Sequence, residues 1–302
     1  MEYPNLEQDF SLIPDEIIAY IEEKLRDGLE KCGLYYRLFS RTKSAASARS
    51  KLQVKNYGET GKKMQDLFGI RIAVYFQDDQ DLCRRIIEDR FSVVSVTQDL
   101  HDPNTFSPTR LNYTCKLPMT CRQMLPDCIC DDYPIDNTVE IQLRTVFSEG
   151  WHEVEHDLRY KSKADWDGSN DLSRALNGIF ATLITCDWSM LNIFEELTKR
   201  KYREKDWTAM LKNKLRIHVE DEPLSEDLCR LLSNRQDLAA ELYQIDRRSL
   251  LDFLSDDRFP GMALTLDNLV FLTNELFMLH DEISAMAPPE LLDEIEACAR
   301  KR

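Results

Sequence analysis

The sequence is 302 residues long, with 43% hydrophobic residues and a formal net charge of −15. This length predicts roughly two domains, and the composition is that of a globular protein able to bury a core. The acidic charge excludes a general coat for nucleic acid or anionic membranes, so any phosphate binding must use a local basic patch.

The sequence shows neither a membrane-spanning nor a secretory signal. No apolar run reaches the roughly 18 residues of a transmembrane helix, and the N-terminus MEYPNLEQDF lacks the regions of a signal peptide. Nine irregularly spaced cysteines in such a chain indicate reduced thiols. We therefore expect a cytoplasmic protein without a membrane partner.

The first half of the chain predicts both helices and strands. Apolar residues at steps of three or four predict a helix over 14–39, and 43–55 could continue as a second helix. A β-branched and aromatic run predicts a central strand at 66–76. Further along we predict a helix at 78–91, a strand at 92–100, a loop at 101–110, strands at 111–118 and 133–145, and a helix at 146–161. This order predicts an α+β fold, with helices flanking a mixed β-sheet.

From about residue 172 the patterns are nearly all helical. We predict helices at 175–197, 206–217, 226–235, 238–245, 264–283 and 288–302. The sequence therefore divides into an α+β domain at 1–170 and a helical C-terminal domain at 171–302. The apolar stripes of the second domain are those of a helical core, or of a surface for a homo-oligomer or a regulatory, antitoxin-like protein.

A basic patch follows the first helix. Between residues 41 and 63 seven Lys and Arg residues stand against one acid, Glu59: Arg41, Lys43, Arg49, Lys51, Lys55, Lys62 and Lys63. Convergent cations of this kind neutralise polyphosphates. A solvated helix face is the alternative interpretation of such a charge run.

Two carboxylates occur on predicted strands. Asp66 opens the strand at 66–76, and Glu140 lies between Val139 and Ile141. A carboxylate beside core residues is costly unless it meets a cation or a metal ion, and two on neighbouring strands could hold Mg²⁺. Alternatively, Asp66 is a turn residue at the strand end and Glu140 faces solvent.

Alternation along 139–144 predicts a polar strand face opposite an apolar one. Val139, Ile141 and Leu143 would share the apolar face, and Glu140, Gln142 and Arg144 the polar one. The next helix would bury the stripe of Trp151, Val154 and Leu158, while His152, Glu155, His156 and Arg159 lie largely off it. Some of these polar residues are expected to turn towards the polar strand face.

Four blocks of this sequence together carry a family resemblance. DLFGIRI, VEIQLRT and WHEVEHDLRYK, preceded by SRTKSAASARSKL at 40–52, resemble the synthetase domain of RelA/SpoT-type alarmone synthetases. That family carries a D-x-x-G-x-R-[IV] strand, an E-[IV]-Q-[IL]-R-T strand and a W-x-x-x-E-H-x-x-x-Y-K helix. The resemblance covers roughly residues 35–165.

The resemblance implies a nucleotidyltransferase-like fold and a definite reaction. The 3′-hydroxyl of a guanine nucleotide attacks the β-phosphorus of ATP, pyrophosphate is transferred, and AMP leaves. By motif match Asp66 and Glu140 would hold Mg²⁺, with Glu140 assisting deprotonation of the hydroxyl. The ATP-binding residues would be Arg41, Lys43, Lys51 and Arg71, and the acceptor side would include Gln142, Arg144 and His156.

One block departs from the family pattern. The family carries G-Y-x-S-x-[HY], whose Tyr stacks on the guanine, where this chain reads TRLNYTCKLP at 109–118. Tyr113 is offset by two positions, so we expect it on the same strand face as the absent Tyr, where it could stack on the acceptor or merely pack. The acceptor is therefore a guanine nucleotide, another nucleotide, or the 3′ end of an RNA such as tRNA. A protein that binds nucleotides without chemistry is a further alternative.

Long members of the family carry an HD-type hydrolase domain before the synthetase. Roughly forty residues precede Arg41, too few for such a domain. The resemblance therefore implies a small synthetase with a single activity and an added helical region.

Overall fold

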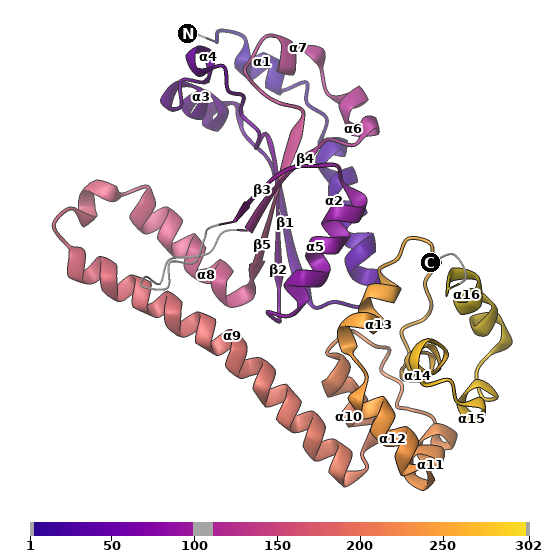
Figure 1. Cartoon of the computed structure of the whole chain (residues 1–302). Coiled ribbons are helices and arrows are strands. Elements are labelled where there is room, and N and C mark those ends of the chain that lie inside the picture. Colours follow the sequence, from indigo (N-terminus) through magenta and orange to yellow (C-terminus); the bar gives the residue numbers. More distant parts are fainter. Residues whose placement is uncertain (1–2, 99–110, 300–302) are drawn as a thin grey trace. The chain divides into compact units, whose positions relative to one another are not determined.

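The computed structural model describes residues 3–98 and 111–299. The chain forms two compact units, of which the first comprises Met1–Asp27 and Tyr36–Asp187, and the second Gly28–Tyr35 and Trp188–Arg302. Figure 1 shows the elements of both units in chain order. The loop expected at 101–110 lies outside the described residues.

The first unit is built on a mixed five-stranded sheet in the order β1-β2-β5-β4-β3. The strands are β1 (Tyr36–Thr42), β2 (Phe68–Val74), β3 (Val93–Gln98), β4 (Leu111–Lys116) and β5 (Thr138–Thr145). Strands β2 and β5 are parallel, and the other neighbouring pairs are antiparallel. The parallel pair therefore places the β2 and β5 motifs side by side at the centre of the sheet.

Helices α2 (Asp15–Lys31) and α5 (Asp79–Arg90) cover one face of this sheet (Figure 1). Their buried residues are apolar at helical spacing, as with Ile17 and Ile21 of α2 and Leu82 and Ile86 of α5. Short helices lie at one end of the first unit: α1 (Leu6–Phe10), α3 (Ala45–Val54), α4 (Tyr57–Thr60), α6 (Met119–Met124) and α7 (Asp127–Asp131).

Helix α8 (Val146–Val154) follows β5 directly and contacts β2 and β5. Thr145 ends the strand and caps the helix, since its hydroxyl accepts a hydrogen bond from the Ser148 N–H at 3.1 Å. The same hydroxyl donates to Asp187 Oδ2 at 2.8 Å. The chain continues through a π-helical turn η1 (Glu155–Tyr160) and a 3₁₀ turn η2 (Lys163–Trp166). The cap fixes where the polar strand face ends and the helix begins.

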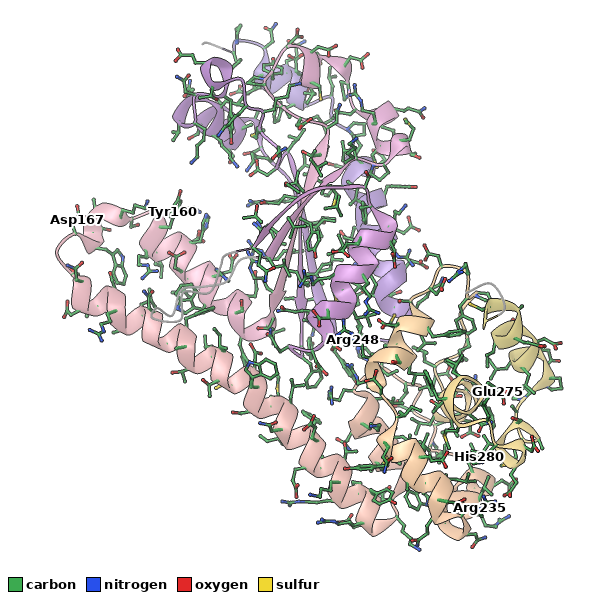
Figure 2. All side chains as sticks on the ribbon, viewed as in Figure 1. Tyr160, Asp167, Arg235, Arg248, Glu275 and His280 are labelled. Atoms are coloured by element: carbon green, nitrogen blue, oxygen red, sulfur yellow. The ribbon has the colours of Figure 1, made fainter. Side chains whose placement is uncertain are left out.

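The remaining elements are helical. They are α9 (Asn170–Glu204), α10 (Trp207–Leu215), α11 (Glu226–Asn234), α12 (Gln236–Gln244), α13 (Arg247–Leu254), α14 (Leu266–Thr273), η3 (Asn274–Met278), α15 (Asp281–Ser284) and α16 (Pro289–Ala299). In the second unit Asn274 ties η3 to α15, because its amide donates to Ser284 Oγ and its Oδ1 accepts from the His280 N–H. Glu275 and His280 are labelled in Figure 2. Among the described residues, no helix combines the length and apolarity needed to cross a membrane.

The predicted fold class is confirmed: a mixed sheet with flanking helices precedes a helical C-terminal region. Some local predictions were wrong. The helix predicted over 14–39 ends at Lys31, and residues 36–42 form edge strand β1. Of the predicted stripe only Trp151 is buried, whereas Val154 and Leu158 are exposed. The domain boundary at residue 170 stays a prediction; helix α9 begins there and continues to Glu204.

Candidate active site

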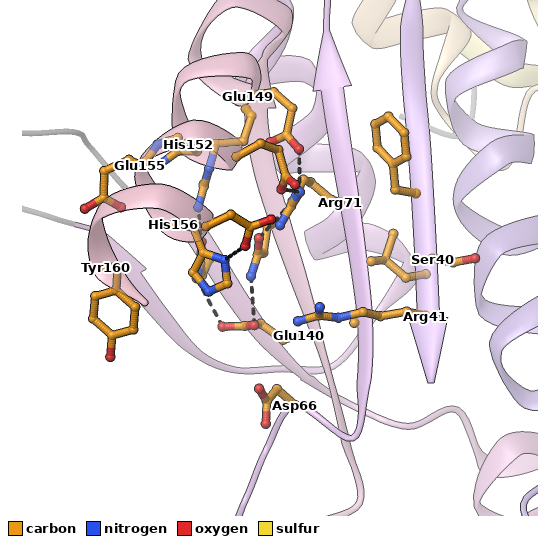
Figure 3. A pocket seen from close by; sticks show the side chains of 18 of the residues that line it. Ser40, Arg41, Asp66, Arg71, Glu140, Glu149, His152, Glu155, His156 and Tyr160 are labelled. Carbon is orange, nitrogen blue, oxygen red and sulfur yellow. Dashed lines mark hydrogen bonds and ion pairs between the residues drawn. The ribbon is translucent and has the colours of Figure 1, made fainter. Parts of the chain in front are cut away.

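A cavity of about 630 Å³ opens on the sheet face that carries the polar residues of β5. Its walls come from β1, α3, β2, β4, β5, α8 and η1, all within the first unit (Figure 3). Cavities of a few hundred Å³ with convergent polar groups are typical of small-molecule sites.

Asp66 lies in this cavity just before β2 and is held by two lysines. Its Oδ2 accepts a hydrogen bond from Lys51 Nζ at 2.6 Å and lies 3.1 Å from Lys43 Nζ. Burial alone would raise the pKa of this carboxyl, but the two ammonium groups outweigh burial and hold the pKa below its usual value. The side chain of Asp66 is therefore ionised at neutral pH.

Glu140 lies on β5 at the centre of a hydrogen-bonded polar network. Its carboxylate accepts from Asn112 Nδ2 at 3.1 Å and from Gln142 Nε2 at 2.9 Å. Arg144 in turn donates to Asn112 Oδ1 at 3.0 Å. Because these donors belong to β4 and β5, the two strands together fix the orientation of the Glu140 carboxylate.

Arg71 joins this network to helix α8. Its Nε donates to Gln142 Oε1 at 3.2 Å, and its Nη1 donates to Glu149 and Glu153 (Figure 3). Burial raises the pKa of Glu149, although Arg71 opposes the shift. The guanidinium of Arg71 thus bonds to side chains of both β5 and α8.

One wall of the cavity is formed by residues of α8 and η1 that recur at helical spacing. Glu149, Glu153, His156 and Tyr160 follow one another at steps of three or four and line the cavity, as does His152, three residues after Glu149. The rings of His156 and Tyr160 are stacked, with centroids 5.9 Å apart. This wall supplies mixed acidic, imidazole and aromatic groups opposite the β1 and β2 residues.

The structure brings together most of the residues singled out from the sequence. Eight of the ten predicted site residues line one cavity: Arg41, Lys51, Asp66, Arg71, Glu140, Gln142, Arg144 and His156. Lys43 is not among the lining residues, but its ammonium group contacts Asp66, which is.

Tyr113 does not line the cavity, contrary to expectation. Its side chain is fully buried, and its hydroxyl accepts from Arg84 Nε at 3.1 Å and donates to Glu88 at 3.2 Å, both on α5. On β4 the residue that faces the cavity is its neighbour Asn112. Because successive side chains of a strand alternate, Tyr113 points to the opposite, α5-covered face.

Sequence reasoning missed several residues of the cavity. Phe39, Asn112, Glu149, Glu153, Tyr160 and Lys161 line it without having been assigned to it. The spacing of Glu149 and Glu153 from His156 was a signal for the helical residues. Phe39 could not be found, because its strand was taken for the end of a helix.

Asp66 and Glu140 fit a magnesium ion bound together with substrate. Oδ1 of Asp66 is buried and has no hydrogen-bond partner among the described residues. Mg²⁺ is commonly bound by one or two carboxylates, with substrate phosphates and water completing its shell. Over 3–98 and 111–299 no cluster of three or more potential metal-ligating His, Cys, Asp or Glu side chains occurs. Asp66 and Glu140 could therefore supply the protein ligands of a Mg²⁺ site whose other ligands come from substrate phosphates and water.

The sequence matches a known protein family over the region that forms this cavity. Residues 40–165 match the family described as "Region found in RelA / SpoT proteins". No curated protein matches the chain significantly.

Solved structures share the fold. Small alarmone synthetase 1 from Bacillus subtilis, in the structure described as bound to its product pppGpp, is 20% identical with a TM-score of 0.50. The alignment covers 64% of this chain and 98% of that one. A GTP pyrophosphokinase family protein from Streptococcus pneumoniae is 18% identical with a TM-score of 0.49, over 64% of this chain and 94% of that one. Residues 40–165 of this chain are thus similar in sequence to the region found in RelA / SpoT proteins.

Proposed function

We propose that this chain is a Mg²⁺-dependent pyrophosphokinase that transfers the terminal diphosphate of ATP to the 3′-hydroxyl of a guanine nucleotide. The observation that carries the proposal is the pairing of Asp66 with Lys43 and Lys51 in the cavity that also contains Glu140. The family match over the same residues supports it, and the pppGpp named for the Bacillus subtilis neighbour supports a guanine acceptor by analogy.

The donor is bound at the β1–β2 side of the cavity. Arg41, Lys43 and Lys51 neutralise the triphosphate of ATP, and Arg71 completes this side. Asp66 and Glu140 would hold Mg²⁺, which when bound neutralises phosphate charge and aligns the β-phosphorus with its attacker. Because the cations belong to a rigid sheet edge and a short helix, their main contribution is positioning.

The acceptor is bound opposite, near Gln142, Arg144 and His156. Its 3′-oxygen attacks the β-phosphorus of ATP, the bond from that phosphorus to the α–β bridging oxygen breaks, and AMP leaves. Glu140 accepts the proton of the attacking hydroxyl. Its two amide donors, Asn112 and Gln142, hold the carboxylate towards the cavity.

A product analysis tests this proposal. The purified protein is incubated with Mg²⁺ and γ-labelled ATP, together with GDP, GTP, other nucleotides or tRNA in separate reactions. We expect AMP and a labelled acceptor carrying two additional phosphates in equal amounts, with GDP or GTP as the best acceptor. Labelled tRNA with no nucleotide product would reassign the acceptor to RNA. Failure to label any acceptor would reject the proposal and favour nucleotide binding without chemistry.

A further inference from the structure

Phe39 is an aromatic residue exposed inside the cavity. It lies on edge strand β1, its side chain is 53% exposed, and it lines the cavity among charged neighbours. Within the part of the chain that the structure describes, its ring makes no ring stacking or cation–π contact. Tyr113, the aromatic residue expected to stack on a nucleobase, is buried on the other face of the sheet. Phe39 is therefore an aromatic surface open to a ligand.

The register of the sheet places Phe39 on the donor side. It pairs with Arg71 across β1 and β2, and Arg41 pairs with Gly69 two positions further along. Residues two apart on a strand share a face, so Phe39 and Arg41 point into the cavity together. Ser40 between them also borders the cavity, but its hydroxyl is directed to α2, where it donates to Glu22 at 2.6 Å.

The phosphate-binding end of the donor side is separate from Phe39. Lys43 follows the end of β1 and is four residues beyond Phe39, a distance of about 13 Å in an extended strand. Asp66 lies beside Lys43. If the triphosphate of the donor is held at Lys43 and Lys51, its nucleoside has room to extend back along β1, towards the stretch of strand where Phe39 pairs with Arg71.

We propose that the adenine ring of ATP stacks on Phe39, which makes Phe39 a specificity-determining residue for the donor. This proposal rests on the proposed function, because that function assigns ATP to the β1–β2 side. A base stacked on an aromatic side chain gains binding energy from its π-face, and it also removes the ring of Phe39 from water. The phosphates alone gain nothing from this residue.

A comparison of two ligands tests the role of Phe39. Binding of ATP and of inorganic tripolyphosphate is measured by calorimetry for the wild type, Phe39→Ala and Phe39→Trp. We expect Phe39→Ala to weaken ATP binding on the order of 10-fold and to leave tripolyphosphate binding unchanged. Phe39→Trp retains the aromatic face and should bind ATP about as well as the wild type. Phe277→Ala, at a Phe of the second unit that is 43% exposed, is the matched control and should change neither affinity.

The results separate this proposal from the proposed function. If Phe39→Ala keeps the wild-type ratio of ATP to tripolyphosphate affinity, Phe39 is not the stacking surface, whatever the transfer assay gives. A wild type that binds tripolyphosphate as tightly as ATP overturns the proposal as well. If no acceptor is labelled but Phe39→Ala selectively weakens ATP binding, the stacking role stands and the transfer reaction does not. Thermal unfolding of each variant confirms that the fold is intact.

Discussion

Lys51 Nζ lies 2.6 Å from Asp66 Oδ2, so a cation that we assign to the donor phosphates is paired with a carboxylate that we assign to the metal ion. Lys43 Nζ lies 3.1 Å from the same oxygen, and Oδ1 is buried. While both lysines stay in place, Asp66 offers no accessible free oxygen to a cation. Phosphate groups compete for the same ammonium groups, so donor binding should release Asp66.

Metal binding is therefore expected to depend on the nucleotide. Mn²⁺ binding, measured by electron paramagnetic resonance, should be weak for the protein alone and at least 10-fold tighter with a non-hydrolysable ATP analogue, a coupling of about 1.4 kcal/mol. Lys51→Met should tighten Mn²⁺ binding to the protein alone and weaken binding of the analogue. Lys63→Met, at an exposed lysine outside the cavity, is the control. Equal Mn²⁺ affinity with and without the analogue would contradict this linkage.

Arg71 and Glu149 are expected to be energetically coupled. Glu149 is largely buried, and one of its oxygens has no hydrogen-bond partner within the described part of the chain, so its charge depends on the guanidinium of Arg71. A double-mutant cycle with Arg71→Ala and Glu149→Ala, read by denaturant unfolding, should give a coupling energy of about 1–3 kcal/mol. Additive effects of the two substitutions would show that the contact does not support the site.

Asp187 should make the stability of the first unit depend on pH. Burial raises the pKa of Asp187 to about 6, although the hydrogen bond from Thr145 opposes the shift. The unfolded chain has a pKa of about 3.9, so protonation stabilises the folded state, and this contribution is lost as the pH rises through about 6.

Asp187→Asn removes this titration. The variant should be more stable than the wild type at pH 8, on the order of 2 kcal/mol, and the difference should shrink as the pH falls towards 4. Thermal unfolding across this pH range measures the effect. A constant difference between Asp187→Asn and the wild type would exclude a raised pKa.

Tyr113 provides a test of the acceptor side. Because its hydroxyl bonds to Arg84 and Glu88 on α5, Tyr113→Phe should cost about 1 kcal/mol of stability and leave the KM for the acceptor unchanged. Denaturant unfolding and initial-rate kinetics check the two expectations. A several-fold rise in the acceptor KM without loss of stability would place Tyr113 in the acceptor site after all.

The residues of the central strands were predictable, because burial on one face enforces a two-residue period. Val139, Ile141 and Leu143 are buried, while Glu140 and Gln142 line the cavity, as alternation predicted. For Tyr113 the sequence left two alternatives, stacking on the acceptor or packing, and the structure shows it packed on the face that α5 covers. A shift of one residue exchanges the two faces of a strand completely.

The edge of the sheet was less predictable. The run Tyr36–Thr42 is partly exposed, and Leu34, two residues before it, continued the apolar spacing of the preceding helix. Edge strands carry a weaker apolar pattern than central ones, so the helical period appeared to extend through it. Because of this error Phe39 and the β1 wall of the cavity were not predicted. The motif with Asp66 and Arg71 was predicted, because its strand has a clear apolar pattern.

The most direct test of the central claim is the transfer rate of Glu140→Gln. This variant keeps the size and most of the hydrogen-bonding capacity of the side chain but loses its charge. We predict that at saturating ATP it forms the pyrophosphorylated acceptor on the order of 10³-fold more slowly, as loss of a base and metal ligand requires. A rate equal to that of the wild type would show that this cavity is not where the diphosphate is transferred.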